Sequence, residues 1–371
     1  MFLIQAADLH HLFQSLANRG YTVIGPTVRD GAIVHDVLRG PEDLPVGWHD
    51  EQDAATYRLH RRMDGEFFRY TVGPIAWKKF LYPPRVRLFS LHKNGRGYSV
   101  SGDGATEGPQ RYAFIGVRPC DLHAIQLLDK VLLTDPYRDS IYAGRREQMC
   151  VIAVHCTHPG GTCFCASMKT GPTAETGYDL AFTEICGEQY HYFTVDVGSM
   201  IGSEIIEEIP HRTAEDVDRS RTHSLQASAA GRMGRILETT HIKEFLQDRL
   251  EDPYWDNVAQ RCLTCANCTM VCPTCFCTTV EDRTDLTGDY AERWRRWDSC
   301  FTLDFAKVAG GNFRSSARAR YRQWLTHKLA SWVDQFDAFG CVGCGRCITW
   351  CPVGIDLTVQ VTAMRQQGEP V

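Results

Sequence analysis

Residues 262–273 read CLTCANCTMVCP, and residues 341–352 repeat the same pattern as CVGCGRCITWCP. Both stretches follow the spacing C-x2-C-x2-C-x3-C and end on a proline. The first run supplies Cys262, Cys265, Cys268 and Cys272, and the second supplies Cys341, Cys344, Cys347 and Cys351. Because eight cysteines fall twice into one register, with proline in place both times, the two runs are the strongest signal in the chain.

This spacing is the run that holds [4Fe–4S] clusters in bacterial-type ferredoxins, because thiolate sulfur is the soft anionic ligand that such clusters require. In two-cluster ferredoxins the fourth cysteine of each run ligates the other cluster. Applied here, that rule pairs Cys272 with the second run and Cys351 with the first, and local ligation is the alternative. The glycines of the second run, Gly343 and Gly345, would let the backbone approach the cluster sulfides.

Zinc is the competing metal for a set of cysteines. All-cysteine zinc sites usually take two C-x2-C pairs from separate hairpins, and neither run is built that way. The two runs therefore predict an electron carrier with two [4Fe–4S] clusters.

The interval between the two runs predicts how they meet. We interpret it as mostly helical, with an amphipathic helix over 314–336 whose apolar residues recur at spacings of three and four. These residues are Ala317, Tyr321, Leu325, Leu329, Trp332 and Phe336. A small β-rich ferredoxin keeps its motifs closer together. We therefore expect a mainly helical dicluster domain over residues 201–371.

The middle of the chain predicts a different architecture. Residues 112–117 and 150–155 are apolar runs typical of buried strands, and residues 121–133 between them are typical of a helix. Strand, helix and strand at this spacing make a βαβ unit with parallel neighbouring strands. We therefore expect residues 1–200 to form an α/β (α+β) domain with a partly parallel sheet.

Four further cysteines belong to this unit. Cys120 follows the first strand and Cys156 the second, so both should lie at the carboxyl edge of the sheet, where α/β proteins place their sites. Cys163 and Cys165 follow in the loop GGTCFC at 160–165. We expect the four thiols to converge as ligands of a third [4Fe–4S] cluster, although buried unreactive cysteines are also frequent.

Composition narrows the class of protein. The chain has 371 residues, a net charge of −5 and 17 cysteines, with 43% hydrophobic and 23% charged residues. A negative net charge argues against a general nucleic-acid binder, and no apolar run is long enough to cross a bilayer. The N-terminus lacks the features of a secretory signal, so we expect a cytoplasmic protein. In that compartment so many cysteines indicate metal ligation rather than disulfides.

The remaining cysteines have plainer interpretations. Cys150, Cys186 and Cys300 lie in apolar surroundings and are predicted to be core residues. Cys275 and Cys277 (TCFC) repeat the local sequence at 162–165, and we expect them to pack beside the first run, with a reactive thiol for sulfur species as the alternative.

Basic residues gather in the interval between the runs. They are either a solvated helix face, or positive charge that docks an acidic partner or eases cluster reduction. The group comprises Arg293, Arg295, Arg296, Arg314, Arg318, Arg320, Arg322 and Lys328. No G-x-G-x-x-G after a strand and no Walker A motif occurs, so no dinucleotide site and no catalytic residue is predicted.

Several stretches together resemble a known family. They are WKKFLYPP (77–84), GVRPCDLH (116–123), CFC (163–165) with TGP (170–172), residues 262–277, residues 293–300, and CVGCGRC (341–347) with VGID (353–356). In this order they resemble the β subunit of cytoplasmic NAD(P)-linked [NiFe] hydrogenases, also called sulfhydrogenases. The chain is similar, by common ancestry, to the electron-transfer subunit of the anaerobic sulfite reductase.

The resemblance implies an iron–sulfur subunit that relays electrons between a flavin subunit, which handles NAD(P)H, and a [NiFe] hydrogenase heterodimer. It implies two or three [4Fe–4S] clusters and no substrate site of the chain's own. It adds weight to Cys120, Cys156, Cys163 and Cys165 as ligands, because the family shows the same stretches. Two alternatives stay open: the electron-transfer subunit of an anaerobic sulfite reductase beside a sirohaem partner, and a subunit that itself reduces sulfur or polysulfide.

Overall fold

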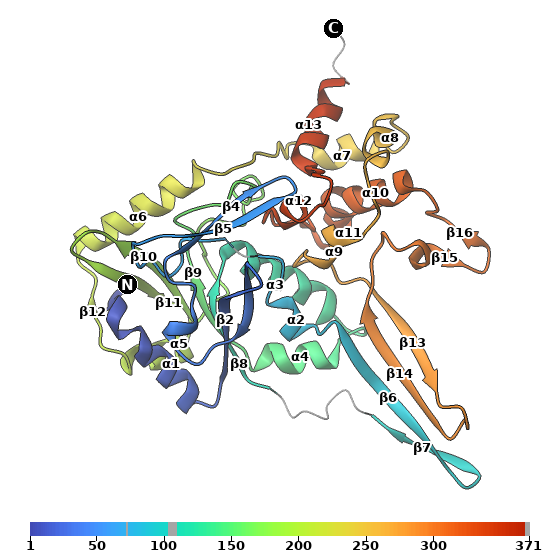
Figure 1. Cartoon of the computed structure of the whole chain (residues 1–371), viewed down its shortest axis with the longest axis horizontal. Helices are drawn as coiled ribbons and strands as arrows, with labels where there is room; N and C mark the ends of the chain where they lie inside the picture. The colour runs from blue at the N-terminus through green and yellow to red at the C-terminus, as the bar shows by residue number, and fades with distance from the viewer. Residues whose placement is uncertain (72, 103–109, 368–371) are drawn as a thin grey trace.

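The molecule has three structural parts, an α/β body, a helical region and a projecting four-stranded sheet (Figure 1). The structure is a computed structural model and describes residues 1–71, 73–102 and 110–367. Among these residues, no helix is long and apolar enough to cross a membrane.

The body is built on an eight-stranded sheet. Its strands are β1 (Phe2–Gln5), β2 (Thr22–Arg29), β3 (Ala32–Val37), β8 (Tyr112–Val117), β9 (Cys150–Val154), β10 (Leu180–Cys186), β11 (His191–Val197) and β12 (Arg212–Thr213). The spatial order is β12-β1-β11-β10-β9-β8-β2-β3. The central strands β2, β8, β9 and β10 run parallel, and the outer pairs run antiparallel. The predicted partly parallel sheet is confirmed.

The expected βαβ unit forms the centre of this sheet. Strand β8 leads into α3 (Pro119–Leu132) and α4 (Ser140–Glu147), and the chain returns as β9, parallel to β8 with Phe114 opposite Val151. Every residue of β8 and β9 is buried, which explains why both read as unbroken apolar runs.

Helices cover both faces of the sheet and enclose two cores. On one face, α1 (Leu9–Asn18) and α5 (Met200–Glu207) pack Leu12 and Ile205 over Ile115 and Ile152. On the other face, α3 packs over the strands together with α4 and the short α2 (Lys78–Leu81). Because both faces are covered, the carboxyl edge of the parallel strands is the part of the sheet where a functional site can lie.

The helical region carries the two cysteine runs. Its helices are α6 (Asp216–Ala230), α7 (Ile242–Gln247), α8 (Tyr254–Ala259), α9 (Asn267–Met270), α10 (Ala317–Thr326), a π-helical turn (His327–Ser331), α11 (Trp332–Phe336), α12 (Arg346–Thr349) and α13 (Leu357–Gln367). The predicted amphipathic helix over 314–336 corresponds to α10, the π-helical turn and α11. Tyr321, Leu325, Leu329 and Trp332 are buried as their spacing indicates.

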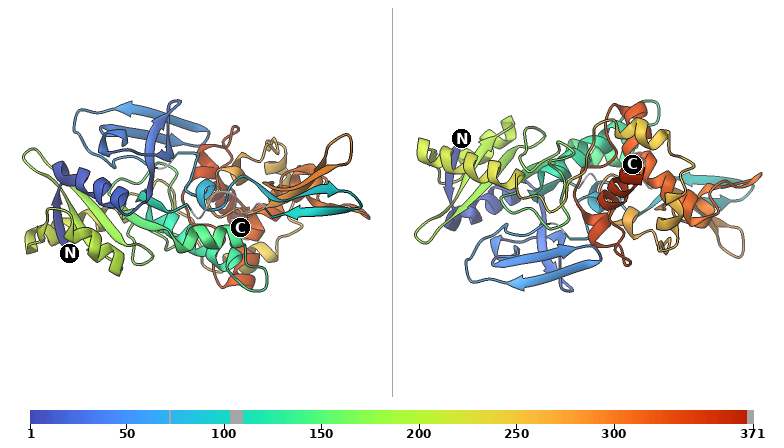
Figure 2. Two further views of the ribbon diagram at one scale, coloured as in Figure 1. Left: turned by 90° about the horizontal axis from the view of Figure 1, so that it is seen from below. Right: turned by 90° about the horizontal axis from the view of Figure 1, so that it is seen from above.

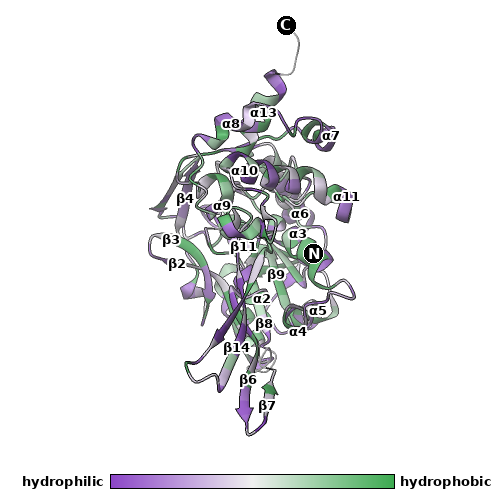
Figure 3. Cartoon of the chain, turned by 90° about the vertical axis from the view of Figure 1, so that its right-hand side faces the viewer, coloured by the Kyte–Doolittle hydropathy of each residue, from purple (hydrophilic) through white to green (hydrophobic). Residues whose placement is uncertain are grey.

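The third part is an antiparallel sheet. It includes two strands from the interval between the cysteine runs, so the expectation that this interval is mostly helical is wrong there. Strands β6 (Arg85–Asn94), β7 (Gly97–Ser101), β13 (Thr278–Thr284) and β14 (Tyr290–Trp297) pair in the order β13-β14-β6-β7. Both views in Figure 2 show this sheet projecting as a thin blade. Residues 278–297 form two antiparallel strands joined by a turn that includes Gly288, so this stretch is a hairpin and not a helix. In Figure 3 strand β14 is mainly hydrophilic, whereas β8 and β9 are hydrophobic.

The blade joins distant parts of the chain, because β6 pairs with β14. The predicted division into residues 1–200 and 201–371 stays a prediction. The remaining elements are short: hairpin β4 (Trp48–Asp53) and β5 (Thr56–Arg61), hairpin β15 (Lys307–Val308) and β16 (Gly311–Asn312), and 3₁₀ turns at Ala6–Asp8, Pro41–Asp43 and Leu303–Ala306.

Candidate iron–sulfur sites

The two cysteine runs fold into the same turn. In the first run Thr264 and Ala266 have φ angles of +51° and +68°, and in the second Gly343 and Gly345 have φ angles of +65° and +75°. Each run then enters a one-turn helix, α9 or α12, that begins at the equivalent position. The shared cysteine spacing is therefore matched by a shared backbone path.

Backbone N–H groups in both runs point at thiol sulfur. The N–H of Thr264 donates to Cys262 Sγ at 3.4 Å, and the N–H of Gly343 donates to Cys341 Sγ at 3.5 Å. The N–H of Ile355 donates to Cys351 Sγ at 3.3 Å. Such donors stabilise sulfur that carries negative charge, as a cluster ligand does.

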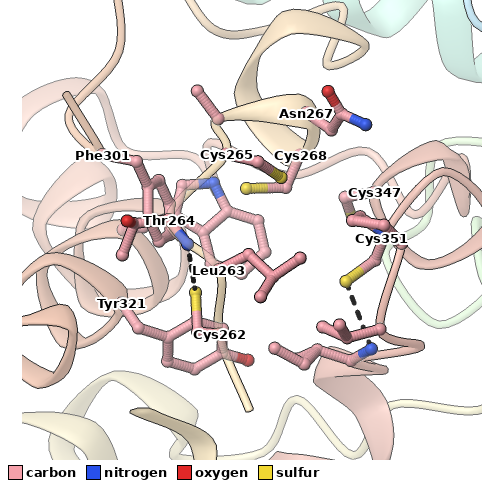
Figure 4. A pocket seen from close by; sticks show the side chains of 15 residues that line it. Cys262, Leu263, Thr264, Cys265, Asn267, Cys268, Phe301, Tyr321, Cys347 and Cys351 are labelled. Carbon is pink, nitrogen blue, oxygen red and sulfur yellow. Dashed lines mark hydrogen bonds between the residues drawn. The ribbon is translucent and has the colours of Figure 1, made fainter. Parts of the chain in front are cut away.

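One group of thiols surrounds a cavity that opens to solvent; we call it the outer group. It comprises Cys262, Cys265 and Cys268 from the first run and Cys351 from the second. The cavity has a volume of about 30 Å³ and is otherwise lined mainly by apolar groups such as Phe301 and Trp324. Figure 4 shows Cys262, Cys265, Cys268 and Cys351 arranged around it.

Cys351 therefore joins the first run, which is the juxtaposition that crossed ligation requires. Four thiols around an apolar cavity are the donor set that a [4Fe–4S] cluster requires. Among the described residues, no three or more His, Cys, Asp or Glu side chains converge closely enough to hold a single metal ion.

A second group of thiols lies deeper; we call it the inner group. It comprises Cys341, Cys344 and Cys347 from the second run and Cys272 from the first. Burial, and then the nearby thiols of Cys341, Cys344 and Cys272, raise the pKa of Cys347 well above its ordinary value. Burial raises the pKa of Cys341 to about 12, and Cys344 and Cys272 are among its neighbours.

The third group lies at the carboxyl edge of the parallel strands, as the βαβ unit predicted; we call it the sheet-edge group. Burial, and then Cys156, raise the pKa of Cys163 to about 12. Burial, and then Cys163 and Cys156, raise the pKa of Cys165. Burial also raises the pKa of Cys120, with Asp121 and then Cys165 adding to the effect. These influences link Cys165 to Cys120, Cys156 and Cys163, although the ligation of a cluster by the four thiols stays a prediction.

Buried contacts fasten the sheet-edge group to the inner group. Arg346, one residue before Cys347, makes two hydrogen bonds of 2.9 Å to the carboxylate of Asp121, one residue after Cys120. The side chains of this ion pair are 1% and 0% exposed. The N–H of Phe164 donates to Gly343 O at 2.8 Å.

The glycines of the second run serve this close approach. A Cβ at Gly345 would lie 2.5 Å from the carbonyl oxygen of Thr162, and one at Gly343 would lie 2.7 Å from the N atom of Cys165. Glycine is therefore required at these two positions because the loop at 162–165 packs against them, in addition to any approach of the backbone to cluster sulfides.

The three groups lie in a row. Cys347 of the inner group also lines the outer cavity, and its charge interacts with Cys268. At the other end, the Cys163 thiol lies 3.9 Å from the carbonyl oxygen of Cys344. The inner group is therefore the middle member.

Two buried lysines border the inner group. Lys328 is one of the basic residues for which easing of cluster reduction was an open interpretation, whereas Lys78 was not singled out for this role. The Lys328 Nζ donates to Cys272 Sγ, and the Lys78 Nζ donates to two carbonyls beside it. Burial lowers the pKa of Lys78. At Lys328 burial also opposes protonation, but the charges of Cys272 and Cys275 outweigh it and raise the pKa.

A sequence signal for these lysines existed. Lys328 follows Leu325 by three positions and precedes Trp332 by four, so it falls on the apolar face of its helix. Lys78 likewise precedes the buried Leu81 by three positions.

The other cysteines fall partly as predicted. Cys150 and Cys300 are buried, but Cys186 is only partly buried because it is the last residue of β10, so its assignment to the core is wrong. Cys275 contacts Cys272, and Cys277 contacts Cys300. The hydrogen bond from Cys300 outweighs burial and lowers the pKa of Cys277 to about 7.

The basic residues of the spacer do not form one solvated helix face. Three lie on β14, each paired with a carboxylate: Arg293 with Asp282, Arg295 with Asp139 and Arg296 with Glu281. On α10, Arg318 and Arg322 both reach Glu251. Most of this charge is therefore compensated within the chain.

Comparison with known proteins agrees with this arrangement. A family model described as a 4Fe-4S dicluster domain matches residues 261–355. The Sulfhydrogenase 2 subunit beta of Pyrococcus furiosus is 34% identical over 309 residues, which cover 81% of this chain and 87% of that protein. No solved structure matches the chain.

Proposed function

The chain belongs to the family of sulfhydrogenase beta subunits, and from this premise we propose that it relays electrons through three [4Fe–4S] clusters in a row. An iron–sulfur electron-transfer role follows from the family and the dicluster domain. The row of outer, inner and sheet-edge groups is the observation that supports three carriers. When bound, each cluster would supply a one-electron carrier.

The outer group suits exchange with a partner subunit. Cys265 is exposed, and Leu263 beside it is 61% exposed. An apolar side chain at the mouth of a thiol-lined cavity fits a protein contact that excludes water. The inner group has no fully exposed thiol and lies between the other two groups, so its place is to pass electrons onward.

We infer that the partners are a flavin subunit, which oxidises NAD(P)H, and a [NiFe] hydrogenase heterodimer. This inference rests on what the relative is called, because a beta subunit named for a hydrogenase implies other hydrogenase subunits. A cytoplasmic location also stays a prediction.

The test is electron flow through the intact complex. Cys351→Ser should abolish most NAD(P)H-driven hydrogen production, while hydrogen production from a reduced dye that feeds the hydrogenase subunits directly continues. The matched control, Cys186→Ser, alters a cysteine outside the row and should change neither rate. Equal NAD(P)H-driven rates in the wild type, Cys351→Ser and Cys186→Ser would refute the proposed relay. Co-purification of a sirohaem subunit in place of hydrogenase subunits would refute the proposed partners.

One observation favours a second candidate, reduction of sulfur or polysulfide by the chain itself. The lowered pKa of Cys277 provides a thiolate at neutral pH, which is the nucleophilic form of cysteine. The purified chain alone, supplied with an artificial electron donor and polysulfide, should then release sulfide, and Cys277→Ala should stop it. Absence of sulfide release would leave the relay as the sole function.

A further inference from the structure

We propose that Lys328 and Lys78 are positioning residues that raise the reduction potential of the cluster held by the inner group above that of the outer group. The inference rests on the proposed function, because it presumes that Cys272 is a ligand of the inner group. It concerns two lysines that hydrogen-bond to the thiol and the backbone of Cys272; neither lysine is itself a cluster ligand.

Lys328 is buried beside Cys272 and donates a hydrogen bond to its thiol. Its side chain lies on the π-helical turn and is 5% exposed. Its Nζ donates to Cys272 Sγ at 3.3 Å, to Thr274 Oγ1 at 3.0 Å and to Gly340 O at 3.1 Å. An ammonium has three N–H donors, so these contacts use its full capacity and fix its direction.

Lys78 approaches the same ligand from the α/β body. Its side chain is 3% exposed, and its Nζ donates to Cys272 O at 2.8 Å and to Cys275 O at 2.9 Å. The ammonium also lies 4.2 Å from the centroid of the Trp297 ring. Two lysines from distant parts of the sequence therefore converge on Cys272.

Neither lysine forms an ion pair with a carboxylate in the parts of the chain that the structure describes. The thiols of Cys272, Cys275 and Cys341 act most strongly on Lys328, and the ammonium groups of Lys78 and Lys328 repel each other. Burying an ammonium without a counter-charge is expensive, so such lysines are retained where negative charge compensates them. The thiolates of the inner group can supply the negative charge that compensates the two buried ammonium groups.

The effect on potential follows from charge. A cluster held by four thiolates is anionic and becomes more negative on reduction, so fixed positive charge nearby favours the reduced form. Backbone N–H groups donate to thiols of both groups, so these bonds do not distinguish the outer group from the inner group. No Lys or Arg side chain within the described residues donates to an outer thiol. The inner group should therefore collect electrons in the middle of the row.

The test is a redox titration followed by EPR on the anaerobically purified full chain, with iron counted in every sample. Cys272→Ser identifies the inner signal as the one that is lost. Lys328→Met should shift the inner midpoint to lower potential by at least a tenfold change in the reduction equilibrium, about 59 mV for one electron. Lys328→Arg keeps the charge and should keep most of the potential. The outer midpoint should not move.

A second variant covers the case in which Lys328→Met loses the inner cluster. Lys78→Met removes a charge that donates hydrogen bonds to carbonyl groups and not to a thiol, and it should shift the inner midpoint in the same direction by a smaller amount. Unshifted inner midpoints in the iron-replete variants, or equal shifts at both clusters, would overturn the inference. A wild-type chain without iron would instead overturn the proposed function.

Discussion

The two cysteine runs share a backbone path and differ in what surrounds them. The first run reaches its left-handed positions with Thr264 and Ala266 and opens to solvent, whereas the second uses Gly343 and Gly345. Glycine is needed in the second run because the loop at 162–165 packs directly against it. The comparison teaches that the cysteine spacing determines the backbone turn. The residues between the cysteines depend on what packs against the run, which is solvent for the first run and the loop at 162–165 for the second.

The largest expected effect comes from breaking the ion pair that holds the second run against the α/β body. Asp121→Asn leaves the guanidinium of Arg346 buried and uncompensated, and we expect a loss of about 3–5 kcal/mol in the free energy of unfolding. Denaturant unfolding of the anaerobic protein measures it. The matched control is Asp282→Asn, which breaks the exposed pair with Arg293 and should cost far less, because solvent screens exposed ion pairs. Equal losses of unfolding free energy in the two variants would show that the buried pair of Asp121 and Arg346 does not hold the second run against the α/β body.

The next effect tests the glycines of the second run. Gly345→Ala places a Cβ against the backbone of Thr162 and forces alanine to a φ of +75°, a conformation that costs of order 1–3 kcal/mol before the clash is counted. We expect lower stability and loss of iron from the inner group, read by unfolding and iron analysis. A stable Gly345→Ala protein with full iron would contradict the role given to the close approach.

The reverse change in the first run should be mildly favourable. Ala266→Gly relieves a left-handed alanine at φ +68°, and we expect a gain of about 0.5–1 kcal/mol in the free energy of unfolding. The same unfolding measurement checks the sign. A loss of stability would show that the methyl group of Ala266 has a packing role in the outer cavity.

The smallest effect concerns Cys277, which lies between the runs. Its pKa of about 7 predicts that alkylation speeds up as the pH rises through 7, because only the thiolate reacts. Cys300→Ala removes the hydrogen-bond donor and should move this rise to higher pH. Mass spectrometry of iodoacetamide-treated protein measures the rate, and buried Cys150 is the internal control that should stay unlabelled. A rate for Cys277 that does not depend on Cys300 would contradict the assignment.

Local patterns made much of the arrangement predictable. The positions of Cys120 and Cys156 at one edge follow from a topological rule, since consecutive parallel strands end on the same side of a sheet. The amphipathic face of residues 314–336 likewise follows from its spacing. Both predictions depend only on residues close together in the sequence.

What could not be predicted depends on partners distant in the sequence. The hairpin at 278–297 is stabilised by pairing with residues 85–94, and no local pattern reveals that pairing. For Lys328 the sequence left a solvated position and a role in cluster reduction both open, and only the fold brings Cys272 to its ammonium. Crossed and local ligation have identical spacing, so only the fold could bring Cys351 to the outer cavity.

The most direct test of the row of three groups is an iron and acid-labile sulfide count on the anaerobically purified chain. The account predicts about twelve irons and as many sulfides per chain, four for each of the three groups. Cys163→Ser should lower the count by about four irons if the sheet-edge group holds its own cluster. A wild-type count near eight or lower, unchanged by Cys163→Ser, would contradict the account.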